Sequence, residues 1–449
     1  MKEVRTRFAP SPTGFMHLGG VRTALYAWLF AKKNGGKFIL RIEDTDQKRY
    51  VEGAVEVIYE TLRECGLNWD EGPYIQSRRR DEYLKYAKEL VKKGEAYYCD
   101  CDGENCECGG LSLTSGIIRQ RVTGEGKTSF NDEIYGVITV ENSEIEEQVL
   151  IKSDGMPTYN FANVIDDHFM NITHVIRGNE FLSSTPKHVL LYKAFGWEPP
   201  VYIHCAQIMR DSSHKLSKRD GDAYFSDFRD KGYLTEAIIN YIALLGWSPK
   251  GALAEREIFS LEELVEAFDA GGISKSPAIF DRDKLKAINA HYIRSMPPEK
   301  FTELAKPYIP KADVDYGVLC AALQQRTEVF SDIPPQTDFI ERACDYEIGL
   351  YDNKKMKTSP ETALQALNAA LEILGNGLFS RDALYGGFKE TAEKSERKIG
   401  WYLYPLQIAL TGKSAAPGGG LDICVILGKD ESLTRIKQAI KKIIVKQSH

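Results

Sequence analysis

The sequence contains no apolar run that approaches the roughly 20 residues needed to cross a bilayer. Its first residues, Met1 to Arg5, lead directly into a strand-like segment without the apolar core of a signal peptide. Internal repeats and low-complexity tracts are also missing, and the composition, 43% hydrophobic and 27% charged, is that of an ordered globular protein. We therefore expect a cytoplasmic protein with no membrane partner.

The chain also has no excess of basic residues: 58 Lys and Arg stand against 64 Asp and Glu, a net charge of -6. This argues against a protein coated in positive charge, but a nucleic-acid partner depends on where basic residues cluster rather than on their sum. The C-terminal stretch is such a cluster, and its basic members are Lys429, Arg435, Lys437, Lys441, Lys442 and Lys446. Apolar residues run along the same stretch, which predicts an amphipathic helix that either contacts phosphates or packs on the core with a solvated basic face.

Cysteine is sparse along most of the chain, where five of the nine cysteines are scattered. The other four, Cys99, Cys101, Cys106 and Cys108, fall within ten residues. In a cytosolic chain such a cluster indicates a metal before a disulfide. Four thiolates close a tetrahedral site and leave no position for a substrate, so the pattern predicts structural rather than catalytic Zn²⁺. Four free thiols are the alternative.

The order of elements near the N-terminus predicts an α/β fold. Residues 4–9 are typical of a strand, residues 18–33 of a helix, and residues 38–40 of a second strand, with a loop rich in Pro and Gly after the first. This order is the start of a Rossmann-like parallel sheet. Short β-like runs then indicate an inserted α+β domain, and the last part of the chain has a helical pattern. The predicted parts are 1–94 and 175–232 for the two halves of the α/β domain, 95–174 for the insertion, and 233–294 and 295–449 for two helical domains.

A first short motif suggests an anion site. His17, Gly19 and Gly20 stand where the loop enters the predicted helix 18–33. The unpaired N–H groups and the dipole at a helix N-terminus attract anions, and glycines let a ligand approach the backbone closely. A helix cap with a satisfied histidine is the alternative explanation.

A second motif lies about 200 residues later. Lys215 and Lys218 flank Ser217 in a polar loop that follows a predicted strand. Two ammonium groups three residues apart can stabilise the charge that builds on a triphosphate. A solvated run of charges would explain this motif alone, but both motifs in one interrupted α/β domain favour a site for ATP.

Longer motifs resemble one family. RFAPSPTG at 7–14 followed by HLGG at 17–20 resembles the first signature of the class I aminoacyl-tRNA synthetases in its glutamyl form, and KLSKR at 215–219 resembles their second. Further similarities are RIEDTD at 41–46, PTYNFANVIDD at 157–167, VIRG at 175–178 and PLQIALTG at 405–412. Over nearly its whole length, the chain resembles a bacterial-type glutamyl-tRNA synthetase.

The resemblance implies the residues of both substrate sites. It places ATP, with Mg²⁺, against His17, Gly19, Gly20, Glu180, Lys215 and Lys218, and it assigns catalysis to His17, Lys215, Ser217 and Lys218. It places glutamate against Arg7, Ala9, Ser11, Glu43, Tyr159, Asn163 and Arg177, with the arginines facing carboxylate and Glu43 facing the ammonium group. Taken singly, Arg7 could instead form a structural salt bridge with Glu43 or Asp44, and Tyr159 and Asn163 could be a core tyrosine and a turn residue.

The implied activity is that of a ligase that activates L-glutamate with ATP and transfers it to the 3′-terminal adenosine of tRNA(Glu), with tRNA(Gln) as an open second acceptor. The insertion would contact the acceptor end, residues 233–294 the stem and residues 295–449 the anticodon, in a monomer. Family members that bind zinc have a longer segment between their ligand pairs than this chain. Three alternatives stand against this interpretation. A glutaminyl enzyme would have a C-terminal half rich in strands, and a short relative that modifies a nucleoside on tRNA would lack that half. A non-enzymatic tRNA-binding paralogue would have lost catalytic residues.

Overall fold

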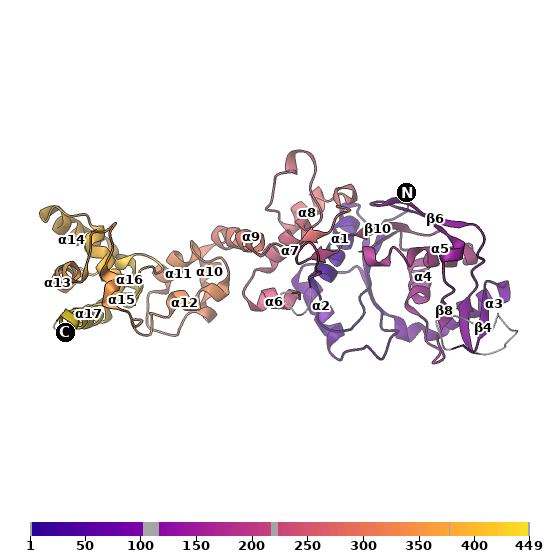
Figure 1. Cartoon of the computed structure of the whole chain (residues 1–449), viewed down its shortest axis with the longest axis horizontal. Coiled ribbons are helices and arrows are strands. Elements are labelled where there is room, and N and C mark those ends of the chain that lie inside the picture. Colours follow the sequence, from indigo (N-terminus) through magenta and orange to yellow (C-terminus); the bar gives the residue numbers. More distant parts are fainter. Residues whose placement is uncertain (1, 102–115, 217–222, 377, 448–449) are drawn as a thin grey trace. The chain divides into compact units, whose positions relative to one another are not determined.

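The computed structural model describes residues 2–101, 116–216, 223–376 and 378–447. The chain forms two compact units, one of residues 1–230 with 234–288 and one of 231–233 with 289–449 (Figure 1). In the described part of the chain, no helix combines the length and apolar character that crossing a bilayer requires.

The first unit begins with the predicted strand, helix and strand. β1 (Arg5–Phe8) leads through the Pro-rich loop into α1 (Leu18–Lys33), and the chain returns as β2 (Lys37–Ile42). The turn between α1 and β2 needs glycine, because a Cβ on Gly36 would lie 2.1 Å from the carbonyl oxygen of Val4. β3 (Glu71–Ile75) completes a parallel sheet of order β1-β2-β3. The predicted helix 18–33 is therefore confirmed to the residue.

A second sheet continues the α/β domain. Its strands, in the order β7-β6-β10-β9, are β6 (Lys127–Asp132), β7 (Gly136–Glu141), β9 (His174–Gly178) and β10 (Val201–Cys205). β10 pairs in parallel with both β9 and β6. The Thr173 N–H, just before β9, donates to the carbonyl oxygen of Arg5 at 2.9 Å. The carboxyl ends of β1, β9 and β10 consequently face the same edge.

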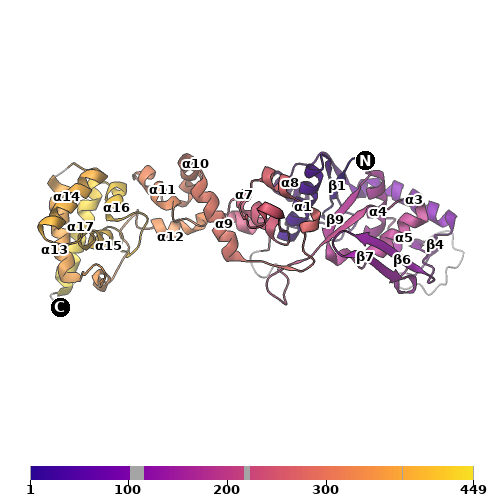
Figure 2. The ribbon, with the colours of Figure 1, turned by 90° about the horizontal axis from the view of Figure 1, so that it is seen from above.

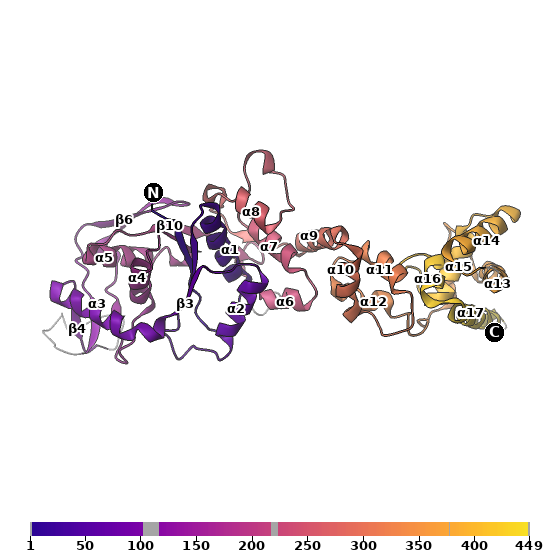
Figure 3. The same cartoon turned by 180° about the vertical axis from the view of Figure 1, so that it is seen from behind.

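A small antiparallel sheet and three helices share a core with this domain. The elements are β4 (Ala96–Cys99), β5 (Ile117–Gln120), β8 (Val149–Ile151), α3 (Arg80–Lys93), α4 (Tyr159–Phe169) and α5 (Thr185–Phe195). Tyr83, Ile118, Leu150, Phe161 and Leu191 lie in one buried cluster. α3 and β4 lie together in Figure 3, β8 lies beside them in Figure 1, and α5 packs against β6 in Figure 2. The expected insertion 95–174 thus shares its sheet and core with the α/β domain.

The rest of the first unit is mainly helical. Its elements are α2 (Ala54–Glu64), α6 (Phe225–Asp230), α7 (Thr235–Leu244), α8 (Leu261–Ala267) and the paired short strands β11 (Ile208–Met209) and β12 (Ala278–Ile279). Arg22 of α1 donates to the carbonyl oxygens of Leu245 and Ala206. This buried arginine joins the end of α7 to the strand edge beside α1.

The second unit has no strand among its described residues, which confirms the predicted helical C-terminal half. Its helices are α10 (Pro298–Ala305), α11 (Tyr316–Gln324), α12 (Pro334–Thr337), α13 (Pro360–Asn376), α14 (Arg381–Lys394), α15 (Gly400–Thr411), α16 (Gly420–Leu427) and α17 (Lys429–Gln447); α9 (Arg282–Ser295) begins in the first unit and ends in this one. The division of the chain into five parts stays a prediction.

The basic C-terminal stretch forms α17, which packs on α13 and α15. Ile436 and Ile443 are buried, as an amphipathic helix requires. The expectation that Arg435 belongs to an exposed basic face is wrong: its side chain is buried and donates to the carbonyl oxygens of Phe339, Ile340 and Leu410. A buried carbonyl oxygen without a hydrogen-bond donor is costly, and Arg435 donates to all three.

Candidate functional site

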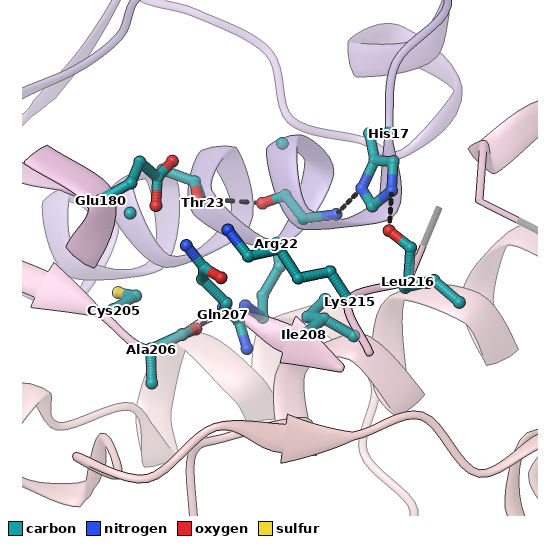
Figure 4. Close-up of a pocket in the computed structure, with 13 residues that line it drawn as sticks. His17, Arg22, Thr23, Glu180, Cys205, Ala206, Gln207, Ile208, Lys215 and Leu216 are labelled. Atoms are coloured by element: carbon teal, nitrogen blue, oxygen red, sulfur yellow. Dashed lines mark hydrogen bonds between the residues drawn. The ribbon is translucent and has the colours of Figure 1, made fainter. Parts of the chain in front are cut away.

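A cavity of about 400 Å³ lies at the N-terminus of α1, beside the carboxyl ends of β9 and β10. Figure 4 shows His17 and Leu216 at one end of it and Glu180 and Cys205 toward the other. The first turn of α1 carries no acidic side chain. The N–H groups of Leu18, Gly19, Gly20 and Val21 are each hydrogen-bonded within the protein. The positive end of the helix dipole, rather than free donors, therefore makes this end of the cavity suited to an anion.

His17 caps α1 and joins the two sequence motifs. Its Nδ1 atom accepts the Gly19 N–H at 3.1 Å, and its Nε2 atom lies 3.2 Å from the carbonyl oxygen of Leu216 (Figure 4). Because Nδ1 accepts, the ring proton lies on Nε2 and is donated to Leu216. His17 therefore caps the helix and also lines the cavity, so the two explanations offered for it from the sequence do not exclude each other.

The two glycines of the first motif line the cavity. A Cβ on Gly20 would meet no other heavy atom within 4 Å, and one on Gly19 would meet only the His17 ring at 3.5 Å. Packing inside the protein therefore does not require glycine at position 20. The open space beside it is the cavity, which agrees with the expected close approach of a ligand.

The first two residues of the second motif, Lys215 and Leu216, line the larger cavity. Lys215 is exposed and lines the cavity, and Leu216 is buried. Ser217 and Lys218, for which catalytic roles were predicted, lie outside the described residues. After them, Ala223 accepts the Leu18 N–H at 2.9 Å, and the Phe225 N–H donates to Met16 at 3.1 Å. The flanks on both sides of 217–222 are therefore fixed at the start of α1.

A second cavity, of about 240 Å³, adjoins the first. Both are lined by Gly19, Gly20, Thr23, Gly178 and Glu180. The smaller cavity is also lined by predicted glutamate-site residues, namely Arg7, Ala9, Ser11, Glu43, Tyr159 and Arg177. The structure thus brings most of the predicted site residues together around two connected spaces.

Buried ion pairs build one wall of the smaller cavity. Arg7 pairs with Asp167 through Nε and Oδ1 at 3.2 Å, and Arg41 reaches Asp167 at 2.7 Å and Glu43 at 2.9 Å. Burial raises the pKa of Asp167, but Arg7 and Arg41 outweigh it and hold that pKa below its usual value. For Glu43, burial prevails over Arg41, and the pKa is raised. The salt bridge between Arg7 and Glu43 or Asp44, which the sequence left open as an alternative, is absent among the described residues.

Asn163 and Tyr159 both come from α4, but only Tyr159 lines the cavity. The Asn163 amide is buried and donates to Glu43 Oε1 at 3.0 Å, so that it supports Glu43 from behind. Its position inside a helix also excludes the turn that sequence reasoning left open. Tyr159 stacks on Phe181, with ring centroids 5.4 Å apart. Burial raises its pKa to about 12, so its hydroxyl stays a donor at neutral pH.

Arg177, at the end of β9, is held by residues that sequence reasoning missed. Its Nε donates to His204 Nε2 at 3.1 Å, and its Nη2 donates to Thr185 Oγ1 at 2.8 Å. His204 in turn contacts Asp132 Oδ2 through Nδ1 at 2.7 Å. No local pattern marks Asp132, since β6 reaches β10 only in the folded sheet.

The described half of the cysteine cluster lies at the end of β4. Cys99 is buried, Cys101 is half-buried, and the Cys101 N–H donates to Cys99 Sγ at 3.3 Å. Cys106 and Cys108 lie outside the described residues. No group of three potential ligands gathers in the part of the chain that the structure describes, so the four-thiol zinc site stays a prediction.

The chain matches known proteins over nearly its whole length. The model of the class I tRNA synthetase (E and Q) catalytic domain matches residues 3–109 and 112–287, and the model of the anticodon binding domain matches 300–440. A glutamate–tRNA ligase of Clostridium novyi (strain NT) is 50% identical, over 98% of each chain. A solved glutamate tRNA ligase of Elizabethkingia meningosepticum, in complex with its amino acid, is 35% identical with a TM-score of 0.88, and covers 98% of this chain and 100% of its own.

Proposed function

The chain belongs to the glutamate–tRNA ligases, a family of class I tRNA synthetases, and we propose that its two connected cavities bind ATP and L-glutamate and join them as glutamyl-adenylate. The observation that carries this proposal is the wall shared by the two cavities at Gly19, Gly20 and Glu180. A carboxylate in the smaller cavity and an α-phosphate in the larger one would meet there. Proximity of this kind is a large part of the catalysis of a two-substrate reaction.

In the first step an oxygen of the glutamate α-carboxylate attacks the α-phosphorus of ATP. An oxygen–phosphorus bond forms, the bond to the β-phosphate breaks, and pyrophosphate leaves. The positive end of the α1 dipole, Lys215 and Lys218 stabilise the negative charge that builds on the phosphates, with Ser217 between the lysines. His17 contributes by holding Leu216, and with it the lysine motif, at the helix N-terminus.

In the second step the 2′-hydroxyl of the terminal adenosine of tRNA attacks the activated carbonyl carbon. The bond from that carbon to the phosphate oxygen breaks, the glutamyl ester forms, and AMP leaves. The hydroxyl proton passes to the released phosphate group or to water. Both sequence motifs, HLGG at 17–20 and KLSKR at 215–219, are intact in the chain. This favours the enzyme over a non-enzymatic tRNA-binding paralogue, which would have lost catalytic residues. Its helical second unit favours the glutamyl over the glutaminyl enzyme.

Glutamate recognition rests on charge. Arg7 and Arg177 line the smaller cavity and offer guanidinium donors to the two carboxylates, and Glu43 offers an acceptor to the ammonium group. Ser11 and Ala9 complete the wall. Glutamine would set an amide against a guanidinium and leave donors poorly paired, which can give strong discrimination.

Two metals accompany the proposal. Mg²⁺ enters with ATP and neutralises phosphate charge. Cys99, Cys101, Cys106 and Cys108 would hold a structural Zn²⁺, and the Cys101 N–H directed at Cys99 Sγ suits a thiolate at that position. No step of the reaction passes through this zinc.

The partner we propose is tRNA(Glu), bound by a monomer in the cytoplasm, with tRNA(Gln) as a second acceptor to be tested. The phosphate contacts assigned to α17 are limited to Lys437 and Lys441, which are exposed. Lys442 and Lys446 already pair with Asp345 and Glu347. Affinity for tRNA should fall with salt, and neutralising Lys437 and Lys441 should flatten that dependence.

The test is ATP–pyrophosphate exchange with glutamate or glutamine, with and without total tRNA. Exchange that depends on glutamate and is at least tenfold weaker with glutamine supports the proposal. Absence of glutamate-dependent exchange in the presence of tRNA overturns it. Charging purified tRNA(Glu) and tRNA(Gln) separately then decides the acceptor.

A further inference from the structure

Arg177 is fixed at two corners of its guanidinium group and open at the third. Its side chain is only 4% exposed, and it lines the smaller cavity. Nε and Nη2 donate to His204 and Thr185, whereas Nη1 is buried and has no partner within the described part of the chain. A buried donor of a charged group is costly to leave unpaired. The open corner therefore indicates a ligand acceptor.

The groups that hold Arg177 are neutral. Among the described residues, Arg177 makes no salt bridge, whereas Arg7 beside it pairs with Asp167. Burial lowers the pKa of His204, and Arg177 lowers it further against the opposing effect of Asp132, so the imidazole is uncharged at neutral pH. Thr185 offers a hydroxyl. The positive charge of Arg177 is thus positioned without being neutralised by direct contact.

The state of His204 depends on Asp132, which is also buried. Asp132 Oδ1 accepts the backbone N–H groups of Ile134 and Tyr135 at 2.9 and 2.8 Å, so this carboxylate has a fixed orientation. Its other oxygen, Oδ2, faces His204 Nδ1 at 2.7 Å. A carboxylate accepts, so Nδ1 carries the proton, and the lone pair of Nε2 is left for the Arg177 Nε–H.

We propose that Asp132 and His204 are positioning residues for amino-acid recognition: the carboxylate fixes the tautomer of the imidazole, and the imidazole aims Arg177 at a substrate carboxylate. This inference rests on the proposed function of the smaller cavity. The opposite tautomer would set two N–H donors against each other and turn the guanidinium away. Neither residue touches the substrate, and both act through Arg177.

Three substitutions test this chain of contacts from Asp132 through His204 to Arg177, called the relay below. In His204→Gln, the amide oxygen reaches the place of Nε2 and can still accept from Arg177. In His204→Asn, the shorter amide reaches the place of Nδ1, which keeps the contact with Asp132 and loses the one with Arg177. Asp132→Asn keeps an acceptor for the backbone N–H groups but presents an NH₂ to His204, which forces the proton onto Nε2.

The measurement is tRNA-dependent ATP–pyrophosphate exchange, with the KM for glutamate, the KM for ATP and kcat determined separately. We expect His204→Asn and Asp132→Asn to raise the KM for glutamate about 10- to 100-fold, the loss of a charge-assisted hydrogen bond. The KM for ATP should stay within about twofold, and His204→Gln within about threefold of the parent for both substrates. ¹⁵N spectra of the labelled histidines should show the Nδ1–H tautomer for His204 in the parent and the Nε2–H tautomer in Asp132→Asn.

A purely structural role predicts a different pattern. Equal effects of His204→Gln and His204→Asn, or equal rises of both KM values, would overturn the inference, and so would a parent His204 protonated on Nε2. If Asp132→Asn fails to fold, the pair of His204 variants still decides. A parent protein without glutamate-dependent exchange would refute the proposed function itself, whereas an active parent with no split between the variants refutes only the relay.

Discussion

The Nε2 atom of His17 lies 3.2 Å from the carbonyl oxygen of Leu216, 199 residues away in the sequence. The same ring caps α1 by accepting the Gly19 N–H through Nδ1. One imidazole therefore connects the first motif to the residue that immediately precedes the Ser217 loop. A change at His17 therefore removes a contact that holds Leu216 beside the start of α1.

Replacing His17 with asparagine separates its two contacts. The Asn side chain is a good N-cap and can still accept from Gly19, but it is too short to reach Leu216. We expect the free energy of unfolding to change by less than about 0.5 kcal/mol and kcat for exchange to fall about 100-fold, the size typical of a lost electrostatic or positioning contact. His17→Ala should lose the cap as well, at about 1 kcal/mol. Urea unfolding and steady-state exchange measure both, and full activity of His17→Asn would refute the bridging role.

Gly20→Ala should improve the helix and impair the enzyme. Alanine is better than glycine inside a helix by about 0.5–1 kcal/mol, and the new Cβ meets no protein atom within 4 Å. It does enter the cavity assigned to ATP. We expect unchanged or higher thermal stability together with a KM for ATP raised at least about tenfold by the lost close approach.

The matched control for this change is Gly386→Ala in α14, where a Cβ also meets nothing within 4 Å and no nucleotide cavity lies. It should gain similar stability and keep the parent KM for ATP. If both variants keep that KM, Gly20 does not border the nucleotide.

The elements that local signals specify could be predicted from the sequence. Helix 18–33 has apolar spacing and a glycine stop, and the N-terminus of a helix carries the positive end of its dipole, which favours an anion. Contacts between distant segments could not be predicted. The sequence left open that Arg7 pairs nearby with Glu43 or Asp44, but its partner Asp167 is 160 residues away and reaches it only in the folded chain. The neighbours of Arg435 in the sequence are those of a surface residue. Only the folded second unit brings the carbonyl oxygens of Phe339 and Leu410 to its guanidinium group.

Glu71 joins three strands and should make stability depend on acid pH. Its carboxylate accepts two hydrogen bonds from Arg5 of β1, at 2.9 and 2.7 Å, and one from Lys37 of β2 at 2.9 Å. These bonds, those of Arg5 first, lower its pKa to about 2. Because the folded pKa is lower than the unfolded value of about 4.3, the stabilisation is complete above the unfolded pKa and disappears as pH falls toward 2.

Glu71→Gln should therefore lose about 1–2 kcal/mol at pH 7, a figure reduced for the water that screens this partly exposed group. The loss should shrink below pH 4, as the parent carboxylate also takes up a proton. Urea unfolding at pH 7 and pH 3 measures it. The control is Glu89→Gln, which removes only an exposed pair with Lys93 and should cost less than about 0.5 kcal/mol at either pH. A loss that stays constant with pH would show that the charge of Glu71 is not its source.

The cysteine cluster predicts one zinc ion per chain. Metal analysis of protein purified without chelators should find about one equivalent, since four thiolates complete a tetrahedral shell. Cys106→Ser removes one ligand and should lower the zinc content by more than half. Cys344→Ser, which changes a half-buried cysteine of the second unit, is the matched control and should keep the full equivalent. Because the predicted site is structural, chelation should lower the melting temperature before it changes the KM for ATP or glutamate. Zinc-free parent protein, or equal zinc in both variants, would contradict the four-thiol site, and the cluster would then consist of free thiols.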